Sequence, residues 1–351
     1  MKKLFLIVLS LIVLGSISVI LVYKNGISAV SNNNELIEFE VLEGSSYMTI
    51  SSALKEKNLI KSELMYKIFV KLNKPNVLEA GKYELSENMG VRKIVNILSS
   101  GGKRETINIV FTEGKNMRYI AKVINENTSN TEDDVFNLLK DKEYINSLID
   151  EYWFLTDDIK NENIYYPLEG YLFPDTYEFY KDDKVKDIFK KMLDEMDSKL
   201  KTLKNDIDNS KYSIHELITL ASIVELEGAK SNDRSKVAGV FYNRLNNNWT
   251  LGSDVTTYYA EKIDDWSVGL KLSELNKCNS YNTRGSCVSG LPVGPISNPS
   301  LDSINAAINP EITNNYYFVA DCDGNTYLNK NEYGHNETIR KLKNQGKWCD
   351  N

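Results

Sequence analysis

The sequence predicts a protein of the α+β class, with one membrane-spanning helix at its N-terminus followed by a smaller and a larger domain. Three observations support this class. An uncharged apolar run opens the chain, short alternating strands recur with helices between them, and a capped helix is expected at residues 213–228. A length of 351 residues is about that of two average domains.

The composition excludes several classes of protein. With 42% hydrophobic and 26% charged residues, the chain is neither disordered nor collagen-like. It has only two histidines, His215 and His335, which are too few for a histidine-rich metal site. We therefore expect no metal and no cofactor, and we expect the chemistry to depend on carboxylates.

The first predicted element is the membrane helix at residues 4–23. This run carries no charge, and about 1.5 Å per helical residue gives it the roughly 30 Å of a bilayer core. A cleaved signal peptide is the alternative, but the run exceeds a typical h-region and no A-x-A-like site follows. Lys2 and Lys3 place residues 1–3 in the cytoplasm by the positive-inside rule, so the lipid bilayer is an expected partner and the catalytic part lies outside the cell membrane.

The part of the chain beyond this helix is acidic. Without Lys2, Lys3 and Lys24 the chain has 39 basic and 49 acidic residues, so the net charge changes from −7 to −10. Phosphate binding requires a basic stripe, and none is visible. No nucleic acid partner is expected.

A polar tether at 24–35 leads to a repeated pattern. The alternating strand at 37–41 is followed by Glu43-Gly44 and a helix, and the same order returns at 107–111 with Glu113-Gly114. Further elements are expected between them: a helix at 61–73, a strand at 81–85, a helix at 91–98 and a closing Gly101-Gly102. Residues 36–104 thus have the build of a LysM-like module, a fold associated with N-acetylhexosamine polymers. A rigid spacer is the alternative.

Residues 105–351 form the predicted catalytic domain, which begins with a polar helical segment up to about residue 160. After it, the stretch 165–179 holds four tyrosines around Glu169, and Tyr171 is among them. Aromatic rings stack on sugar faces and a carboxylate accepts hydroxyl protons, so this stretch suits a sugar-binding cleft. On the residues alone, packing of the tyrosines against a core is the stronger interpretation.

The helix at 213–228 contains the best catalytic candidate. Ser213 and Glu216 form a capping box at its start, and Gly228 is expected to end it. Glu225 falls on or beside the apolar face, where loss of solvation is expected to raise its pKa and let it act as a general acid. A satisfied boundary residue is the alternative.

Several blocks then occur in order: YPLEGYLFPDTY (166–177), LASIVELEG (220–228), KVAGVFYNRL (236–245), LGSDVTTYY (251–259), YNT (281–283), GLPVGPISNPS (290–300), YYFVA (316–320) and GHN (334–336). Together they resemble the MltG (YceG-like) family of membrane-anchored endolytic murein transglycosylases. The resemblance covers residues 38 to about 340.

This resemblance implies cleavage of the MurNAc-β-1,4-GlcNAc bond of nascent peptidoglycan strands, which leaves 1,6-anhydroMurNAc ends and terminates glycan elongation. Glu225 matches the catalytic glutamate, acting first as acid and then as base, and Glu169 matches a position that lines the cleft. Peptidoglycan synthases are the implied partners. A non-catalytic wall-binding scaffold and a muramidase that uses water remain the alternatives.

Further substrate-binding candidates follow from these blocks. Asn243 and Arg244 could donate to sugar hydroxyls or carboxylates, with a structural cap as the equal alternative. Asp254 lies in a turn of a block beside the cleft. One wall of the cleft is expected from Tyr281, Asn282 and the Gly-Pro loop 290–299, which includes Asn298.

The four cysteines all lie in the last quarter of an exported chain, where disulfides form. Spacing does not choose among the three pairings. We favour Cys278 with Cys287, which closes a short loop, and Cys322 with Cys349, which ties down the C-terminus. A four-thiolate metal site is the rival, but no C-x-x-C pair occurs.

Overall fold

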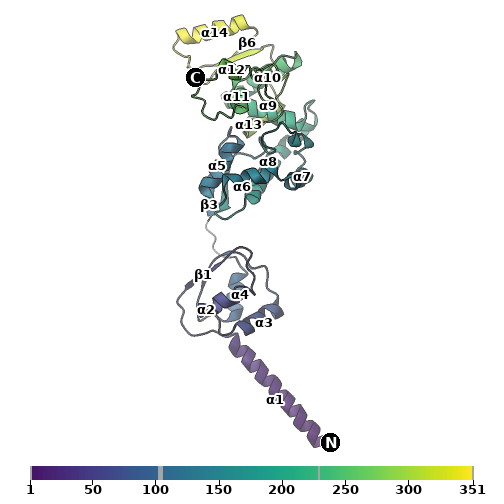
Figure 1. Cartoon of the computed structure of the whole chain (residues 1–351), viewed down its shortest axis with the longest axis vertical. Coiled ribbons are helices and arrows are strands. Elements are labelled where there is room, and N and C mark those ends of the chain that lie inside the picture. Colours follow the sequence, from purple (N-terminus) through teal and green to yellow (C-terminus); the bar gives the residue numbers. More distant parts are fainter. Residues whose placement is uncertain (1, 102–105, 228–229, 350–351) are drawn as a thin grey trace. The chain divides into compact units, whose positions relative to one another are not determined.

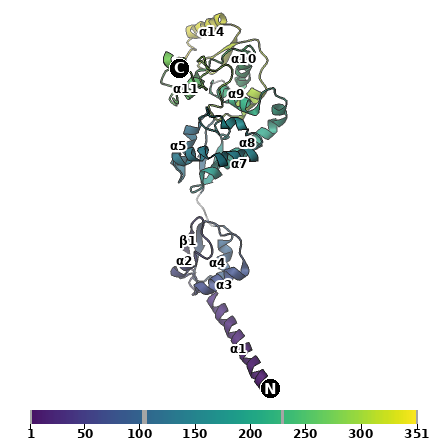
Figure 2. The ribbon, with the colours of Figure 1, turned by 45° about the vertical axis from the view of Figure 1, so that its right-hand side comes forward.

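The computed structural model describes residues 2–101, 106–227 and 230–349. The chain divides into two compact units, Met1–Glu105 and Thr106–Asn351, which are described separately. Figure 1 shows their elements along the sequence, and Figure 2 shows them from a second side. Both units mix helices with antiparallel strand pairs, which agrees with the predicted α+β class.

The first unit begins with helix α1, Lys2–Gly26. Its stretch Leu9–Gly26 is the one candidate membrane span among the described residues. Large apolar side chains such as Leu14 and Leu21 stay exposed on it. A helix that exposes so much apolar surface is suited to an apolar environment.

The rest of the first unit has the element order that the sequence predicts. Strand β1 (Ile37–Val41) pairs antiparallel with β2 (Gly81–Leu85), and the pairing sets Phe39 opposite Tyr83. The helices are α2 (Ser51–Glu56), α3 (Glu63–Asn73) and α4 (Val91–Leu98). Side chains of all five elements fill one core, so this small unit has an apolar interior of its own. Of the expected closing pair Gly101-Gly102, the second lies outside the described residues.

The second unit is mainly helical. Its strand pairs are β3 (Thr106–Val110) with β4 (Thr176–Tyr180), and β5 (Tyr317–Ala320) with β6 (Thr326–Asn329). Its helices are α5 (Met117–Asn127), α6 (Glu132–Lys140), α7 (Lys142–Glu151), η1 (Asp157–Lys160), α8 (Val185–Asp208), α9 (Ile214–Leu226), η2 (Ser231–Asp233), α10 (Arg234–Asn246), α11 (Asp254–Ala260), α12 (Leu272–Leu275), α13 (Leu301–Ile308) and α14 (Glu332–Asn344).

The repeated turns are built in the same way in both units. Gly44 follows β1 with a φ of +78°, and Gly114 follows β3 with a φ of +71°. Side chains with a Cβ are strained in this left-handed region, so glycine is the residue that fits both turns. The repeat seen in the sequence therefore reflects a shared local geometry.

Helix α9 lies inside the second unit and packs against α10 and α13 (Figures 1 and 2). The capping box is present: Ser213 Oγ accepts from the Glu216 amide, and the Glu216 carboxylate accepts from the Ser213 amide. The expected single apolar face is wrong, because every residue from Ile214 to Val224 except Glu216 is buried. Neighbouring helices surround α9, so it is buried on all sides. The helix ends at Leu226, and the expected stop Gly228 lies outside the described residues.

The cysteines form two disulfides, Cys278–Cys287 and Cys322–Cys349. These are the two pairs that the sequence analysis favours. The first closes the loop that carries Tyr281 and Asn282, and the second joins the turn after β5 to the segment after α14.

Candidate active site

Glu225 lies in the last turn of α9, where its carboxylate is held from two sides. Arg234 Nη2 donates to Oε1 over 2.8 Å. Ser300 donates to Oε2 from both its backbone amide, at 2.9 Å, and its hydroxyl, at 2.5 Å. Only 6% of the Glu225 side-chain surface is exposed. The carboxylate is therefore fixed in one orientation by three hydrogen bonds.

The two residues that hold Glu225 begin other helices. Arg234 is the first residue of α10, and Ser300 is the N-cap of α13. Arg234 Nη1 also donates to Ser300 Oγ over 2.6 Å, which closes a triangle of three side chains. Glu225 thus follows a run of buried residues in α9, and α10 and α13 also bring a guanidinium and a hydroxyl to it.

Glu225 lines a groove of about 820 Å³, here called the Glu225 groove. Its lining includes Glu225, the turn 113–116, side chains of α5 and the segment 263–266. Trp266 in this lining is 43% exposed and stacks on Tyr258 with ring centroids 5.8 Å apart. An exposed aromatic face beside a carboxylate in a groove of this size suits a sugar chain.

The Glu113-Gly114 turn passes directly over Glu225. A Cβ built on Gly114 would lie 3.3 Å from Glu225 Cγ, so no larger residue fits without displacing the glutamate. Burial, and then the negative charge of Glu225, raise the pKa of Glu113. A second carboxylate therefore faces the groove close to Glu225.

Glu169 lies beneath this turn and is 1% exposed. Its carboxylate accepts hydrogen bonds from the Met117 amide at 3.0 Å, from the Tyr259 hydroxyl at 3.0 Å and from Asn298 Nδ2 at 3.2 Å. Burial raises the pKa of Glu169 to about 7. All its partners are protein groups, and Met117 begins α5, so Glu169 supports one wall of the groove from behind.

Asn298 joins three segments at the same place. Its side chain accepts from the Leu172 amide and donates to the Lys115 carbonyl, and its backbone amide also donates to that carbonyl. Its own carbonyl accepts from Gly114. The loop 290–299 is thereby tied to the turn that covers Glu225. Asn298 is 1% exposed, and the contacts described here hold the loop in place.

Tyr171 is fully buried, and its hydroxyl lies 2.8 Å from His215 Nδ1. His215 Nε2 lies 3.0 Å from the Val293 carbonyl. Because a carbonyl can only accept, Nε2 carries the proton and Nδ1 accepts from Tyr171. Tyr171 thus packs in the core, which is the interpretation that the residues alone favour, and substrate contact at Tyr171 stays a prediction.

Asn243 and Arg244 lie outside the lining of the Glu225 groove. Asn243 Nδ2 donates to the carbonyls of Thr313 and Asn315 at 2.7 and 2.8 Å. Arg244 Nε donates to the Tyr316 carbonyl at 2.7 Å. Both residues therefore fasten α10 to the chain that enters β5, which corresponds to the structural alternative.

The remaining candidates also contact protein. Asp254 pairs with Arg284 at the surface. The buried Tyr281 hydroxyl accepts from the Tyr165 amide at 3.2 Å. Asn282 Nδ2 donates to three carbonyls of the segment 274–277. These contacts order the loop that the Cys278–Cys287 disulfide closes, and none of the three residues lines the Glu225 groove.

Sequence reasoning missed the residues that complete the site. Arg234 lies outside every quoted block, Ser300 is the last residue of one, and Glu113 appears there only as part of a turn. The repeated Glu-Gly turn was an available signal for Glu113. Arg234 reaches Glu225 only because α9 and α10 pack together, and a single sequence gives no signal for that contact.

The fold and the site define an α+β protein with a fixed glutamate, Glu225, in a wide groove that also holds aromatic and further acidic side chains. Among the described residues, no group of three or more histidine, cysteine or acidic side chains could hold a metal ion. The chain belongs to the YceG-like family, whose model matches residues 39–341.

Curated relatives and one solved structure are similar over most of the chain. An endolytic murein transglycosylase of Bacillus subtilis (strain 168) is 36% identical over 307 residues, which is 87% of this chain and 84% of the relative. The protein of that name from Streptococcus pneumoniae serotype 2 is 30% identical over 325 residues, 88% of this chain and 59% of the relative. The crystal structure of a yceG-like protein from Listeria monocytogenes aligns with a TM-score of 0.62 and 34% identity, and covers 87% of this chain and 100% of that chain.

Proposed function

We propose that this protein is an endolytic murein transglycosylase, which cuts the MurNAc-β-1,4-GlcNAc bond within peptidoglycan strands and leaves 1,6-anhydroMurNAc ends. The observation that carries the proposal is the fixed carboxylate of Glu225 at the edge of a groove large enough for several sugar rings. The relatives from Bacillus subtilis and Streptococcus pneumoniae carry the name of this activity.

In the proposed mechanism Glu225 acts twice. In its protonated form Glu225 first gives a proton to the bridging oxygen as the bond from C1 of MurNAc breaks. The C6 hydroxyl of the same sugar then attacks C1, and Glu225 takes up its proton, so the carboxyl group is restored and no water is consumed. One carboxylate is enough for this sequence, whereas hydrolysing glycosidases use two at a defined separation. Arg234 and Ser300 keep Glu225 oriented toward the groove.

The other candidate function is a scaffold that binds the wall without cutting it. The match of named transglycosylases over most of the chain disfavours it. A muramidase would use the same groove and differ only in its product, because water in place of the C6 hydroxyl would leave a reducing MurNAc end.

We further propose that α1 anchors the protein in the cell membrane, with its N-terminus in the cytoplasm and both units outside. The length and apolar character of Leu9–Gly26 support an anchor, and Lys2 and Lys3 support this orientation. The strand, two helices and antiparallel second strand of residues 37–85 support a LysM-like role in holding glycan. We also propose that the protein acts beside peptidoglycan synthases and ends the glycan strands that they make.

The test is digestion of un-crosslinked peptidoglycan strands by the purified chain, with mass analysis of the products. Anhydro ends from the wild type and intact strands with Glu225→Gln are expected. Glu216→Gln is the matched control, because it changes a glutamate at the other end of α9 that lies outside the groove. Equal digestion by Glu225→Gln would overturn the mechanism, and reducing MurNAc ends would replace it with hydrolysis.

A further inference from the structure

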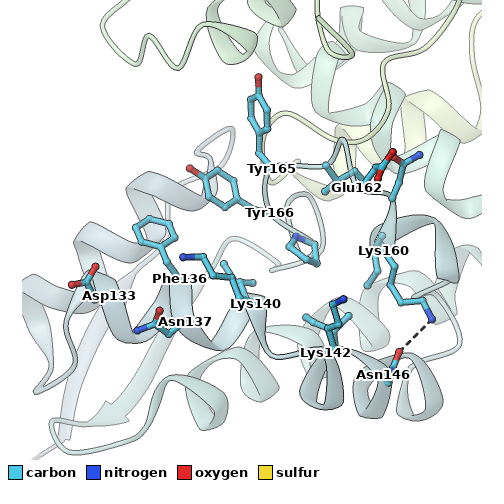
Figure 3. A pocket seen from close by; sticks show the side chains of 16 residues that line it. Asp133, Phe136, Asn137, Lys140, Lys142, Asn146, Lys160, Glu162, Tyr165 and Tyr166 are labelled. Carbon is cyan, nitrogen blue, oxygen red and sulfur yellow. Dashed lines mark hydrogen bonds between the residues drawn. The ribbon is translucent and has the colours of Figure 1, made fainter.

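A second cavity of about 840 Å³ lies in the same unit, between α6, α7, η1 and the segment 164–167. We call it the lysine cavity after Lys140, Lys142 and Lys160 in its lining. Figure 3 shows Phe136, Tyr166 and Lys140 gathered on one side of it, and Lys142 and Lys160 on the other. Glu225 is not part of its lining.

Two of the three lysines have free ammonium groups. Among the described residues, neither Lys140 nor Lys142 forms an ion pair or a side-chain hydrogen bond, and both are exposed. Lys160 bonds Asn146 at 3.2 Å and Asp157 at 2.5 Å. The lining also holds the carboxylates of Asp133 and Glu162, so its three lysines leave a formal excess of one positive charge on a part of the chain whose net charge is −10. Lys140 and Lys142, which have no carboxylate partner among the described residues, are the side chains that attract carboxylates here.

The cavity also offers aromatic surface. Phe136 and Tyr166 lie with ring centroids 5.6 Å apart at an angle of 30°, and both rings are half-buried. Tyr165 lies beside them, and Lys262 Nζ lies over its ring, 4.7 Å from the ring centroid. Apolar ring faces next to cations fit an N-acetylated sugar that carries an acidic group.

The lysine cavity adjoins the Glu225 groove. Glu132 lines the groove and its neighbour Asp133 lines the cavity, so both reach the first turn of α6. Arg118 of the groove interacts with Tyr166 of the cavity. Arg118 Nη1 is buried at this junction and has no hydrogen-bond partner among the described residues.

We infer that the lysine cavity is a second binding site for the same glycan strand, where Lys140 and Lys142 bind carboxylates on a sugar unit several positions from the bond that is cut. This inference rests on the proposed function. The carboxylates come either from the peptide stems of the strand or from the free lactyl groups of strands without stems. A strand held at two places is positioned more firmly across Glu225 than one held at the cut alone.

The experiment measures strand binding to the full chain in detergent micelles, with Glu225→Gln present so that strands stay intact. Three fluorescent probes are compared: strands that carry peptide stems, strands stripped of stems by an amidase, and neutral chitin oligosaccharides. The test variant is Lys140→Ala/Lys142→Ala. The control is Lys186→Ala/Lys341→Ala, which removes the same charge from exposed lysines outside both cavities.

The Kd of an acidic probe is expected to rise about tenfold in the test variant, with no change for chitin or for the control. Loss confined to stem-bearing strands identifies the peptides as the ligand, and loss with stripped strands identifies the lactyl groups. An unchanged Kd for both acidic probes, or an equal rise for all three, would overturn the inference. If lysine-dependent binding is found but the chain with Glu225 intact cuts no strand, the proposed function fails and the second site stands.

Discussion

Arg234 and Glu225 face each other across the junction of α9 and α10, with Nη2 of the first 2.8 Å from Oε1 of the second. Both side chains are largely buried, at 12% and 6% exposure. An ion pair in such a place fixes geometry more than it adds stability, because burial of both charges offsets much of their attraction. The orientation of the proposed catalytic carboxylate thus depends on a residue of another helix.

Replacing Arg234 should therefore impair catalysis more than binding. We expect Arg234→Ala to lower kcat about 100-fold with little change in KM, because Glu225 loses its orientation while the groove keeps its shape. Arg234→Lys should recover part of the loss, since it keeps the charge but not the planar fork that reaches both Glu225 and Ser300. The measurement is strand digestion at several substrate concentrations. Arg340→Ala, which breaks only a surface pair with Glu337, is the control, and an equal effect there would refute the role.

Ser300 has two roles that a matched pair of variants can separate. Its hydroxyl caps α13 by accepting from the Ser303 amide, and it donates to Glu225. Ser62 caps α3 in the same way but lies in the first unit. We expect Ser300→Ala and Ser62→Ala each to cost about 1 kcal/mol of unfolding free energy, measured by denaturant titration. Only Ser300→Ala should also lower kcat, and normal activity in that variant would contradict the site.

The buried Glu169 should make stability depend on pH. Its pKa is raised from the ordinary 4.5 to about 7, so the fold favours the protonated form. The stabilisation that this gives is complete below pH 4.5 and is lost as the pH rises through 7, because the unfolded chain ionises freely and the folded one must bury the charge. Between pH 5 and pH 8 the melting temperature of the wild type should fall by more than the melting temperature of Glu169→Gln. Parallel curves for the two proteins would show that Glu169 does not cause the dependence.

Features of the fold that depend on neighbouring residues in the chain could be predicted from the sequence. Contacts between residues far apart in the sequence could not. The capping box of Ser213 and Glu216 and the strand 37–41 depend on neighbours in the chain, so their patterns identify them. Helix α8 is absent from the predicted elements, although its buried Ile188, Met192 and Met196 recur at helical spacing. That helix was therefore predictable.

The candidate active site shows more clearly which residues a single sequence could not predict. Glu225 could be singled out by its helix and its family block, but its partners could not. Ser300 is separated from it by 75 positions in the sequence, and only the packing of α13 on α9 brings its hydroxyl to the carboxylate. Glu169 and Tyr171 are buried as well, and for Tyr171 the sequence already favoured packing against a core.

The last prediction concerns the repeated Glu-Gly turn. The turn at Gly114 lies beside Glu225, whereas the turn at Gly44 lies in the first unit. Gly44 and Gly114 have nearly the same φ, +78° and +71°, so alanine at either should cost about 1–2 kcal/mol of unfolding free energy through backbone strain. Their surroundings differ. A Cβ on Gly44 meets nothing within 4 Å among the described atoms, whereas one on Gly114 lies 3.3 Å from Glu225 Cγ and 3.2 Å from Leu226 Cδ2.

Gly114→Ala must therefore push the glutamate by a few tenths of an ångström, in addition to straining the turn. We expect kcat on un-crosslinked strands to fall about tenfold in Gly114→Ala and to stay unchanged in Gly44→Ala, at similar losses of unfolding free energy. Measuring both quantities on both variants separates displacement of Glu225 from loss of stability. Equal kcat values for the two variants would mean that the turn does not set the position of Glu225, and the proposed dependence of catalysis on that position would have to be abandoned.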